Sequence, residues 1–231
     1  MQYRTLTVAR EFGSGGGRIA NTIAGWLGWK LLDAEIINAI ARTANVESHV
    51  VRHYDERVDS WLRRLNEEAL RGVAMATGRP EQVVGLHFFN PVPVLRLVEI
   101  ITSLLTSPET AERARTFATD RLGKRVIASP DRAGFVVNAL LIPYILSAVR
   151  MLESGFATAD DIDTGMVEGC AHPMGPLHLA DLIGLDTTQA VAESLYDEFK
   201  EPLYAAPPLL NRMVDAGLLG RKAGQGFYSY K

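Results

Sequence analysis

Hydrophobic residues along this chain follow two different periods, and the change between them falls near residue 135. Apolar, β-branched runs at 83–89, 97–102 and 123–128 are bounded by turn residues and predict strands. Between the last two, the pattern predicts a helix over 107–122, with Ser107 as its N-cap and Pro108 in its first turn. This part of the chain therefore has an α/β pattern.

After Phe135 the apolar residues recur every three or four positions, which is typical of helices packed on one another. Thr158 and Asp161 fit a capping box at the start of one of them. The fold class that follows is α/β, a partial parallel sheet with flanking helices followed by an all-α carboxyl-terminal domain. Helices are expected over residues 136–154, 158–168, 176–184, 187–199 and 208–216.

The amino-terminal end reads as a strand, a glycine-rich loop and a helix. A strand is expected over 5–9, and apolar residues at helical spacing follow the loop. Backbone N–H groups of such a loop can converge on an anion at the start of a helix, so a nucleotide phosphate is the natural ligand. The loop consists of Gly13, Ser14, Gly15, Gly16 and Gly17.

Three interpretations compete for this loop. A dinucleotide fingerprint can be fitted from Gly15 to Ala20 with Asp33 as the ribose acid, but the strand then ends early and Asp33 follows too soon. A Walker-type loop lacks its Lys-Ser/Thr pair. The segments REFGSGGGRIA, LLDAEIINAIA and HYDERVDSWLRRL together resemble the start of the cytidylate-kinase-like family over residues 3–72. The resemblance implies a nucleotide binder without the basic lid of such a kinase, so kinase activity is not expected.

Net charge, cysteine content and the length of apolar runs indicate which partners and which compartment to expect. The formal net charge of −3 gives no reason to expect a nucleic-acid partner. The lone Cys170 cannot form an internal disulfide and is expected to be a small buried side chain, and no apolar run reaches membrane-spanning length. We therefore expect a globular protein of the cytoplasm with no membrane association.

The most informative motif is GLHFFNPVPV at 85–94, with Glu99 twelve residues after His87. A strand, a tight turn and a returning strand would bring the two side chains together. An imidazole held by a carboxylate can take a proton from an alcohol, so the pair predicts acid/base chemistry. We expect a preformed hydrogen bond of about 3 Å.

This motif, with LVEII, DRAGFVVNALLIPY and HPMGPLHLADLIGLD, resembles the NAD-dependent 3-hydroxyacyl-CoA (3-hydroxybutyryl-CoA) dehydrogenase family over about residues 73–231. The resemblance implies that His87, Glu99 and Asn138 are catalytic, with NAD as cofactor and an acyl-CoA as substrate, in fatty acid β-oxidation or butanoate metabolism. It also implies a homodimer formed through the helical domain. The organisation expected is a partial kinase-like segment at 1–72, the final strands of a nucleotide-binding domain at 73–130 and a helical domain at 131–231.

Other polar residues have weaker assignments. Asn90 faces either ligand or its own backbone, Asn138 could instead cap a helix, and Lys222 either approaches NAD, as the resemblance implies, or lies in a solvated turn. His172 and His178 have no third ligand beside them, so no metal site is expected.

The stretch before residue 73 departs from the dehydrogenase pattern, since that family's glycine fingerprint, ribose acid and substrate-binding serine segment are not found there. The chain has the pattern of a chimera joined near 70–79, and its dehydrogenase activity is expected to be impaired. Two alternatives stay open: a cytidylate-kinase-like nucleotide binder, and a non-catalytic helical module for dimerisation or acyl-CoA binding.

Overall fold

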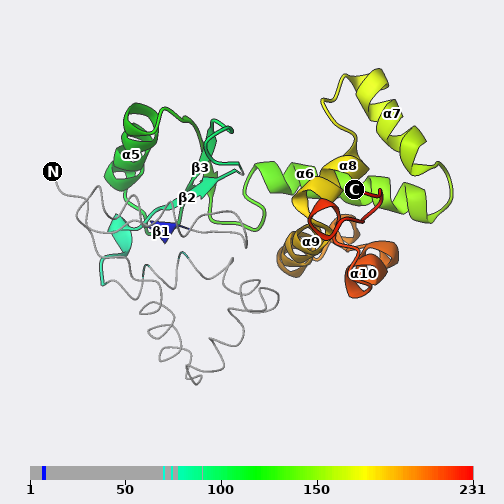
Figure 1. Ribbon diagram of the computed structural model, residues 1–231. Helices are drawn as coiled ribbons and strands as arrows, with labels where there is room; N and C mark the ends of the chain where they lie inside the picture. The colour runs from blue at the N-terminus through cyan, green and yellow to red at the C-terminus, as the bar shows by residue number, and fades with distance from the viewer. Residues whose placement is uncertain (1–6, 9–69, 71–73, 75–77, 90, 231) are drawn as a thin grey trace. The chain divides into compact units, whose positions relative to one another are not determined.

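The computed structural model describes residues 7–8, 70, 74, 78–89 and 91–230, and their contacts divide into two units, with the division between Phe135 and Val136. The first unit contains a sheet and the second is helical (Figure 1). The described elements of the first unit are β1 (Thr7–Val8), η1 (Pro80–Gln82), β2 (Gly85–Phe88), β3 (Leu97–Thr102), α5 (Pro108–Thr116), η2 (Phe117–Arg121) and β4 (Arg125–Pro130).

The described sheet has the order β1-β2-β3-β4. β1 runs parallel to β2, β2 antiparallel to β3, and β3 parallel to β4. The partial parallel sheet that the sequence predicts is present in the β1–β2 and β3–β4 pairs. The β2–β3 pair is antiparallel, because the turn between these two strands is too short for a parallel crossover. The longer connection through α5 allows β3 and β4 to be parallel.

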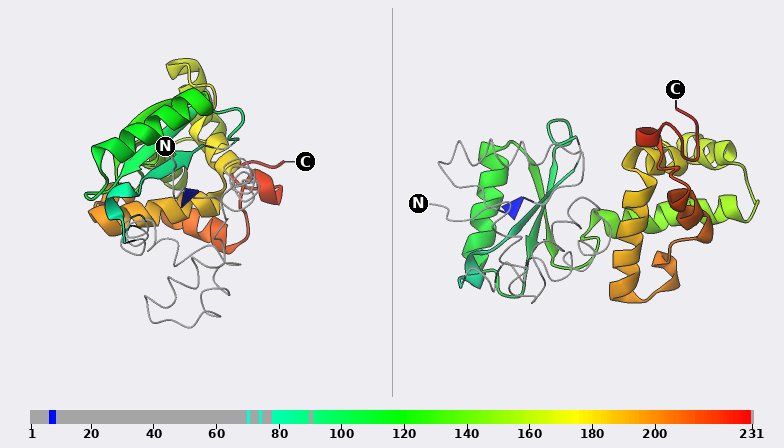
Figure 2. Two further views of the ribbon diagram at one scale, coloured as in Figure 1. Left: turned by 90° about the vertical axis from the view of Figure 1, so that its left-hand side faces the viewer. Right: turned by 60° about the horizontal axis from the view of Figure 1, so that its bottom comes forward.

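α5 covers one face of this sheet (Figure 2). Leu86, Val98, Ile100 and Ala114 form the buried cluster between them. The helix begins where the sequence predicts, since the Ser107 side chain accepts a hydrogen bond of 3.1 Å from the Thr110 backbone N–H. This cap fixes the start of α5, the helix that carries the chain from β3 to β4.

The second unit is all helical, as the apolar spacing predicts. Thr158 caps α7, accepting from the Asp161 N–H at 3.2 Å and donating its hydroxyl to the Asp161 carboxylate at 2.6 Å. α7 extends away from the other helices of the unit (Figure 1). The elements are α6 (Val137–Glu153), α7 (Ala159–Cys170), α8 (Pro176–Ile183), α9 (Leu185–Phe199), η3 (Pro202–Tyr204), α10 (Pro208–Asp215) and η4 (Arg221–Ala223).

A continuous apolar core joins α6, α8, α9 and α10, with Ile145, Leu146, Leu177, Leu195 and Leu210 fully buried. Among the described residues, no helix is long and apolar enough to cross a membrane. The expected buried position of Cys170 is wrong, because the residue is exposed at the end of α7.

Candidate active site

His87 and Glu99 lie opposite each other in the antiparallel β2–β3 register. The His87 Nδ1 atom is 2.7 Å from Oε2 of Glu99, so the predicted pair is confirmed. Glu99 is fully buried, whereas the His87 side chain is 22% exposed. The carboxylate is thus inside the protein, and the imidazole is only partly exposed.

This arrangement determines which nitrogen of His87 can act as a base. With Glu99 ionised, the hydrogen bond requires a proton on Nδ1, so the neutral imidazole carries its lone pair on Nε2. Oriented in this way, the imidazole can accept a proton from a substrate while the carboxylate stabilises the positive charge that forms.

Two phenyl rings flank the imidazole of His87. The ring centroid of Phe89 lies 4.6 Å away, tilted by 53°, and that of Phe135 lies 5.4 Å away, tilted by 52°. Phe135 has a φ of 49°, in the left-handed region that non-glycine residues seldom occupy. Holding it there costs about 1–2 kcal/mol, which the surrounding contacts must offset.

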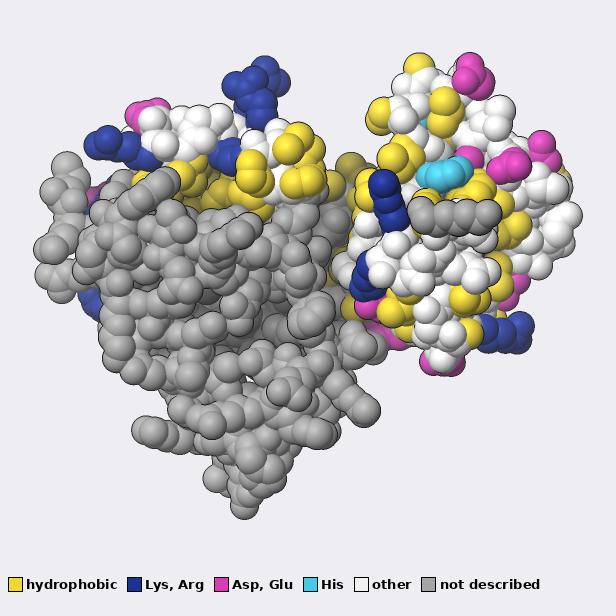
Figure 3. Space-filling view, viewed as in Figure 1, with side chains coloured by type: hydrophobic (Ala, Val, Ile, Leu, Met, Phe, Trp, Pro, Cys, Tyr) yellow, Lys and Arg dark blue, Asp and Glu magenta, His cyan; other side chains and the backbone are white. Residues whose placement is uncertain are grey.

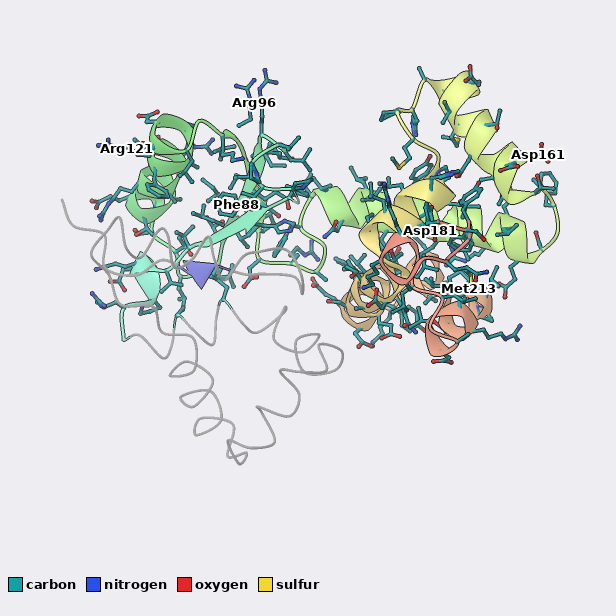
Figure 4. The ribbon with its side chains drawn as sticks, viewed as in Figure 1. Phe88, Arg96, Arg121, Asp161, Asp181 and Met213 are labelled. Carbon is teal, nitrogen blue, oxygen red and sulfur yellow. The ribbon has the colours of Figure 1, made fainter. Side chains whose placement is uncertain are left out.

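The turn between β2 and β3 is held by Lys124, a residue that belongs to no recognisable motif. Its Nζ atom donates to the backbone carbonyls of Val92 at 2.5 Å and Leu95 at 2.7 Å. The Arg125 N–H adds a backbone hydrogen bond of 2.7 Å to Arg96, whose side chain extends away from the sheet (Figure 4). The loop joining the two members of the pair is therefore tied to the start of β4.

β1 is the strand that precedes the glycine loop in the sequence, and it is a member of the described sheet. Residues Gly13–Gly17 and Asn90 lie outside the described residues, so the predictions on them are untested. β1 does pair in parallel with β2, through Thr7 opposite Gly85 and Val8 opposite Leu86. The carboxyl ends of β1 and β2 hence meet at the edge of the sheet where His87 lies.

Asn138 is the second residue of α6 and is half-buried. The residue at the N-cap of that helix is Val136, so the structure does not support the alternative that Asn138 caps it. Because Asn138 belongs to the helical unit, its meeting with His87 stays a prediction.

Lys222 forms an ion pair in the carboxyl-terminal tail. Its Nζ atom lies 2.6 Å from each carboxylate oxygen of Asp186, near the start of α9. The lysine is 48% exposed in its side chain, so it is neither buried nor simply solvated. Its predicted approach to the cofactor remains untested.

A second imidazole–carboxylate pair lies in the helical unit. The buried carboxylate of Asp163 accepts from the His178 Nδ1 atom at 2.6 Å, from the backbone N–H groups of Leu177 and His178, and from the Tyr228 hydroxyl at 3.0 Å. Burial, followed by the nearby Asp163 charge, raises the pKa of Tyr228. With two backbone donors among its partners, Asp163 caps the start of α8 and holds the tail.

His172 also has a structural partner, since its Nδ1 atom is 3.0 Å from the Tyr144 hydroxyl. Within the described part of the chain, no group of three or more His, Cys, Asp or Glu residues could hold a metal ion. These histidines therefore bind neighbouring protein groups in the structure.

Comparison with known proteins gives two adjacent family matches. Residues 69–132 match the 3-hydroxyacyl-CoA dehydrogenase NAD binding domain, and residues 134–230 match the C-terminal domain of the 3-hydroxyacyl-CoA dehydrogenases. A 3-hydroxybutyryl-CoA dehydrogenase of Mycobacterium tuberculosis is 51% identical over 199 residues, which cover 84% of this chain and 70% of that protein. The mitochondrial hydroxyacyl-coenzyme A dehydrogenase of Homo sapiens is 38% identical over 200 residues, covering 85% of this chain and 63% of that protein.

A solved structure agrees with these matches. The crystal structure of M. tuberculosis FadB2 has a TM-score of 0.68 and 58% sequence identity, and the match covers 69% of this chain and 56% of that one. The chain thus spans little more than half the length of that structure. The 84% coverage in the sequence alignment exceeds what residues 73–231 alone can supply, so that similarity extends upstream of residue 73.

Proposed function

The chain belongs to the 3-hydroxyacyl-CoA dehydrogenase family, and on this premise we propose that its His87–Glu99 pair serves the NAD-dependent interconversion of a 3-hydroxyacyl-CoA and a 3-oxoacyl-CoA. The 2.7 Å hydrogen bond between the two side chains carries the proposal. A short-chain substrate such as 3-hydroxybutyryl-CoA is favoured by the name of the M. tuberculosis relative. The proposed setting is fatty acid β-oxidation or butanoate metabolism in the cytoplasm.

The mechanism begins at Nε2 of His87, which removes the proton of the substrate's 3-hydroxyl group. Glu99 keeps the proton on Nδ1 and stabilises the imidazolium, and Asn138 supplies an amide that orients the substrate oxygen. NAD, the cofactor named in the description of the family's NAD binding domain, would when bound supply the acceptor for the hydride of C3. In the reverse direction His87 returns the proton to the 3-oxo group.

The described sheet fits a dinucleotide at its carboxyl edge. In open α/β sheets such ligands bind beyond the carboxyl ends of parallel strands, and β1 and β2 present those ends beside His87. We propose Asn90 and Lys222 as additional cofactor contacts. The glycine-rich sequence that follows β1 is the natural place for a phosphate, whether of NAD or of another nucleotide.

We further propose that activity is impaired. Hydride transfer requires the reacting atoms to be held near contact, which supplies about 7–11 kcal/mol of catalysis. Similarity to the M. tuberculosis dehydrogenase extends upstream of residue 73, but the sequence there lacks the family's glycine fingerprint. Losing about 7 kcal/mol of positioning would lower the rate by roughly 10⁵-fold.

The test is oxidation of NADH by acetoacetyl-CoA, followed by absorbance at 340 nm. The unmodified chain should give a rate at or near background. Replacing residues 1–72 with a dehydrogenase nucleotide-binding segment should restore turnover, and His87→Gln in that repaired chain should abolish most of it. Turnover of the unmodified chain at about 1–10³ s⁻¹ would show that the amino-terminal segment already binds NAD productively.

A second candidate is a cytidylate-kinase-like nucleotide binder. The parallel pairing of β1 with β2 is compatible with it, as it is with NAD binding, because the strand before the glycine loop is a member of the sheet. Weak binding of ATP or CMP without phosphoryl transfer is expected, and calorimetric titration against NADH and acetoacetyl-CoA separates the candidates. Robust phosphorylation of CMP would contradict our view of this segment.

A third candidate is a non-catalytic helical module that dimerises and binds acyl-CoA. Exposed hydrophobic side chains on the helical unit support a homodimer, as Figure 3 shows for one face. Leu140 is 73% exposed and Phe156 81% exposed. Sedimentation of the chain and of a Leu140→Glu, Phe156→Glu variant would show whether the helical unit forms the dimer.

A further inference from the structure

The two phenyl rings beside His87 differ in how they reach it. Phe89 follows β2 directly, so its place is a consequence of the strand. Phe135 comes from the far end of the unit, after β4, and is positioned by a turn in which its N–H donates to the Arg132 carbonyl at 3.1 Å. Its contact with the imidazole therefore depends on the local backbone.

That backbone is unusual for a large side chain. Gly134 and Phe135 are both left-handed, with φ of 72° and 49°. Glycine adopts this conformation freely, but a phenylalanine does not, and an outlier beside a functional group is a reason to infer a role.

We infer that Phe135 is a positioning residue, which holds its ring against His87 so that the imidazole keeps one orientation and stays shielded from bulk water. Glu99 fixes one edge of the imidazole through Nδ1, and the rings of Phe89 and Phe135 flank it. A ring held in this way cannot rotate Nε2 away from a substrate without breaking these contacts. The inference rests on the proposed role of His87 as the base.

The test uses diethylpyrocarbonate, which acylates accessible imidazoles, with site-specific rates read by mass spectrometry. Phe135→Gly removes the ring in a backbone conformation that glycine adopts without strain, so the fold should persist. It should raise the modification rate of His87 severalfold while the rate at His172 stays constant. Phe135→Tyr, which keeps the ring, should restore the parent rate.

Lys200→Gly is the matched control, because Lys200 has a φ of 55° in the same left-handed region but lies far along the chain, at the end of α9. It should leave the His87 rate unchanged. An unchanged His87 rate in Phe135→Gly would overturn the inference, and a rise at both His87 and His172 would show general loosening and overturn it equally.

The repaired chain separates this inference from the proposed function. There Phe135→Gly should lower kcat by up to about 10²-fold with a smaller change in KM, as expected for a misplaced base. If the His87 modification rate rises but no form of the protein oxidises NADH, the positioning contact stands and the proposed function fails. If turnover is present and kcat is unaffected, the shielding does not position the base and the inference is wrong.

Discussion

Asp181 should be the most important single anchor of the carboxyl-terminal tail, and Asp181→Ala should destabilise the helical unit strongly. The side chain is 1% exposed and lies among the helices of that unit (Figure 4). It accepts hydrogen bonds from the backbone N–H groups of Phe227 at 3.0 Å and Tyr228 at 2.9 Å, and from the Tyr230 hydroxyl at 3.0 Å.

The expected loss follows from these partners. A hydrogen bond to a charged group contributes about 1.5–3 kcal/mol, and a buried donor left without a partner costs about 1–3 kcal/mol. The two backbone N–H groups lose their acceptor together, while the half-buried tyrosine hydroxyl can turn toward water. We expect a loss of about 3–5 kcal/mol in the free energy of unfolding, a large fraction of a typical domain's stability.

Urea unfolding followed by circular dichroism at 222 nm is the appropriate assay. Circular dichroism follows the helices directly, whereas Trp26, Trp29 and Trp61 all lie in the amino-terminal segment of the sequence. Asp197→Ala is the control, since Asp197 is 65% exposed and pairs only with the exposed Lys200 in the structure described; it should change stability by less than about 0.5 kcal/mol. A loss of less than about 1 kcal/mol for Asp181→Ala would refute the reasoning.

Three further predictions concern the pair, its turn and the tail. In a form of the protein that turns over, Glu99→Gln should lower kcat by roughly 10²–10⁴-fold, measured as NADH oxidation, because the neutral amide cannot stabilise the His87 imidazolium; an unchanged kcat would remove Glu99 from the mechanism. Lys124→Met should lower the free energy of unfolding, measured in urea, by about 1–2 kcal/mol, a loss that solvent exposure of the turn keeps small. An unchanged free energy of unfolding would show that water fully replaces the hydrogen bonds of the ammonium group. Burial, with the hydrogen bond to Asp181, raises the pKa of Tyr230 to about 12, so the contribution of Tyr230 to stability should be fully present below pH 10 and be lost as pH rises toward 12. Tyr230→Phe should reduce that alkaline loss, and an identical pH profile in the variant would contradict the assignment.

Local sequence signals predicted much of the fold. The helices of the second unit begin within about two residues of their expected positions, because Thr158 and the prolines at 176 and 208 mark those starts chemically. The His87–Glu99 pair was predictable because a turn between adjacent strands fixes the register.

Other features depend on contacts that sequence spacing cannot reveal. The left-handed backbone of Phe135 is a property of the folded turn, and Lys124 resembles any lysine at the start of a strand. Asp163 and Asp181 are buried although carboxylates are usually exposed, because backbone donors from distant segments surround them. Cys170 was misjudged because α7 extends into solvent at its end.

The neighbours of β2 also determine the order in which the two units can form. Thr7 pairs with Gly85, so this part of the sheet cannot close until a long stretch of chain has been synthesised and the entropy of closing that loop has been overcome. Contacts in the helical unit join residues much nearer in sequence, such as α8 with α9, and should form quickly. During synthesis from the amino terminus, β1 is made long before its partner β2. Until β2 has been made, the edge of β1 stays unpaired and is open to chaperones or to aggregation.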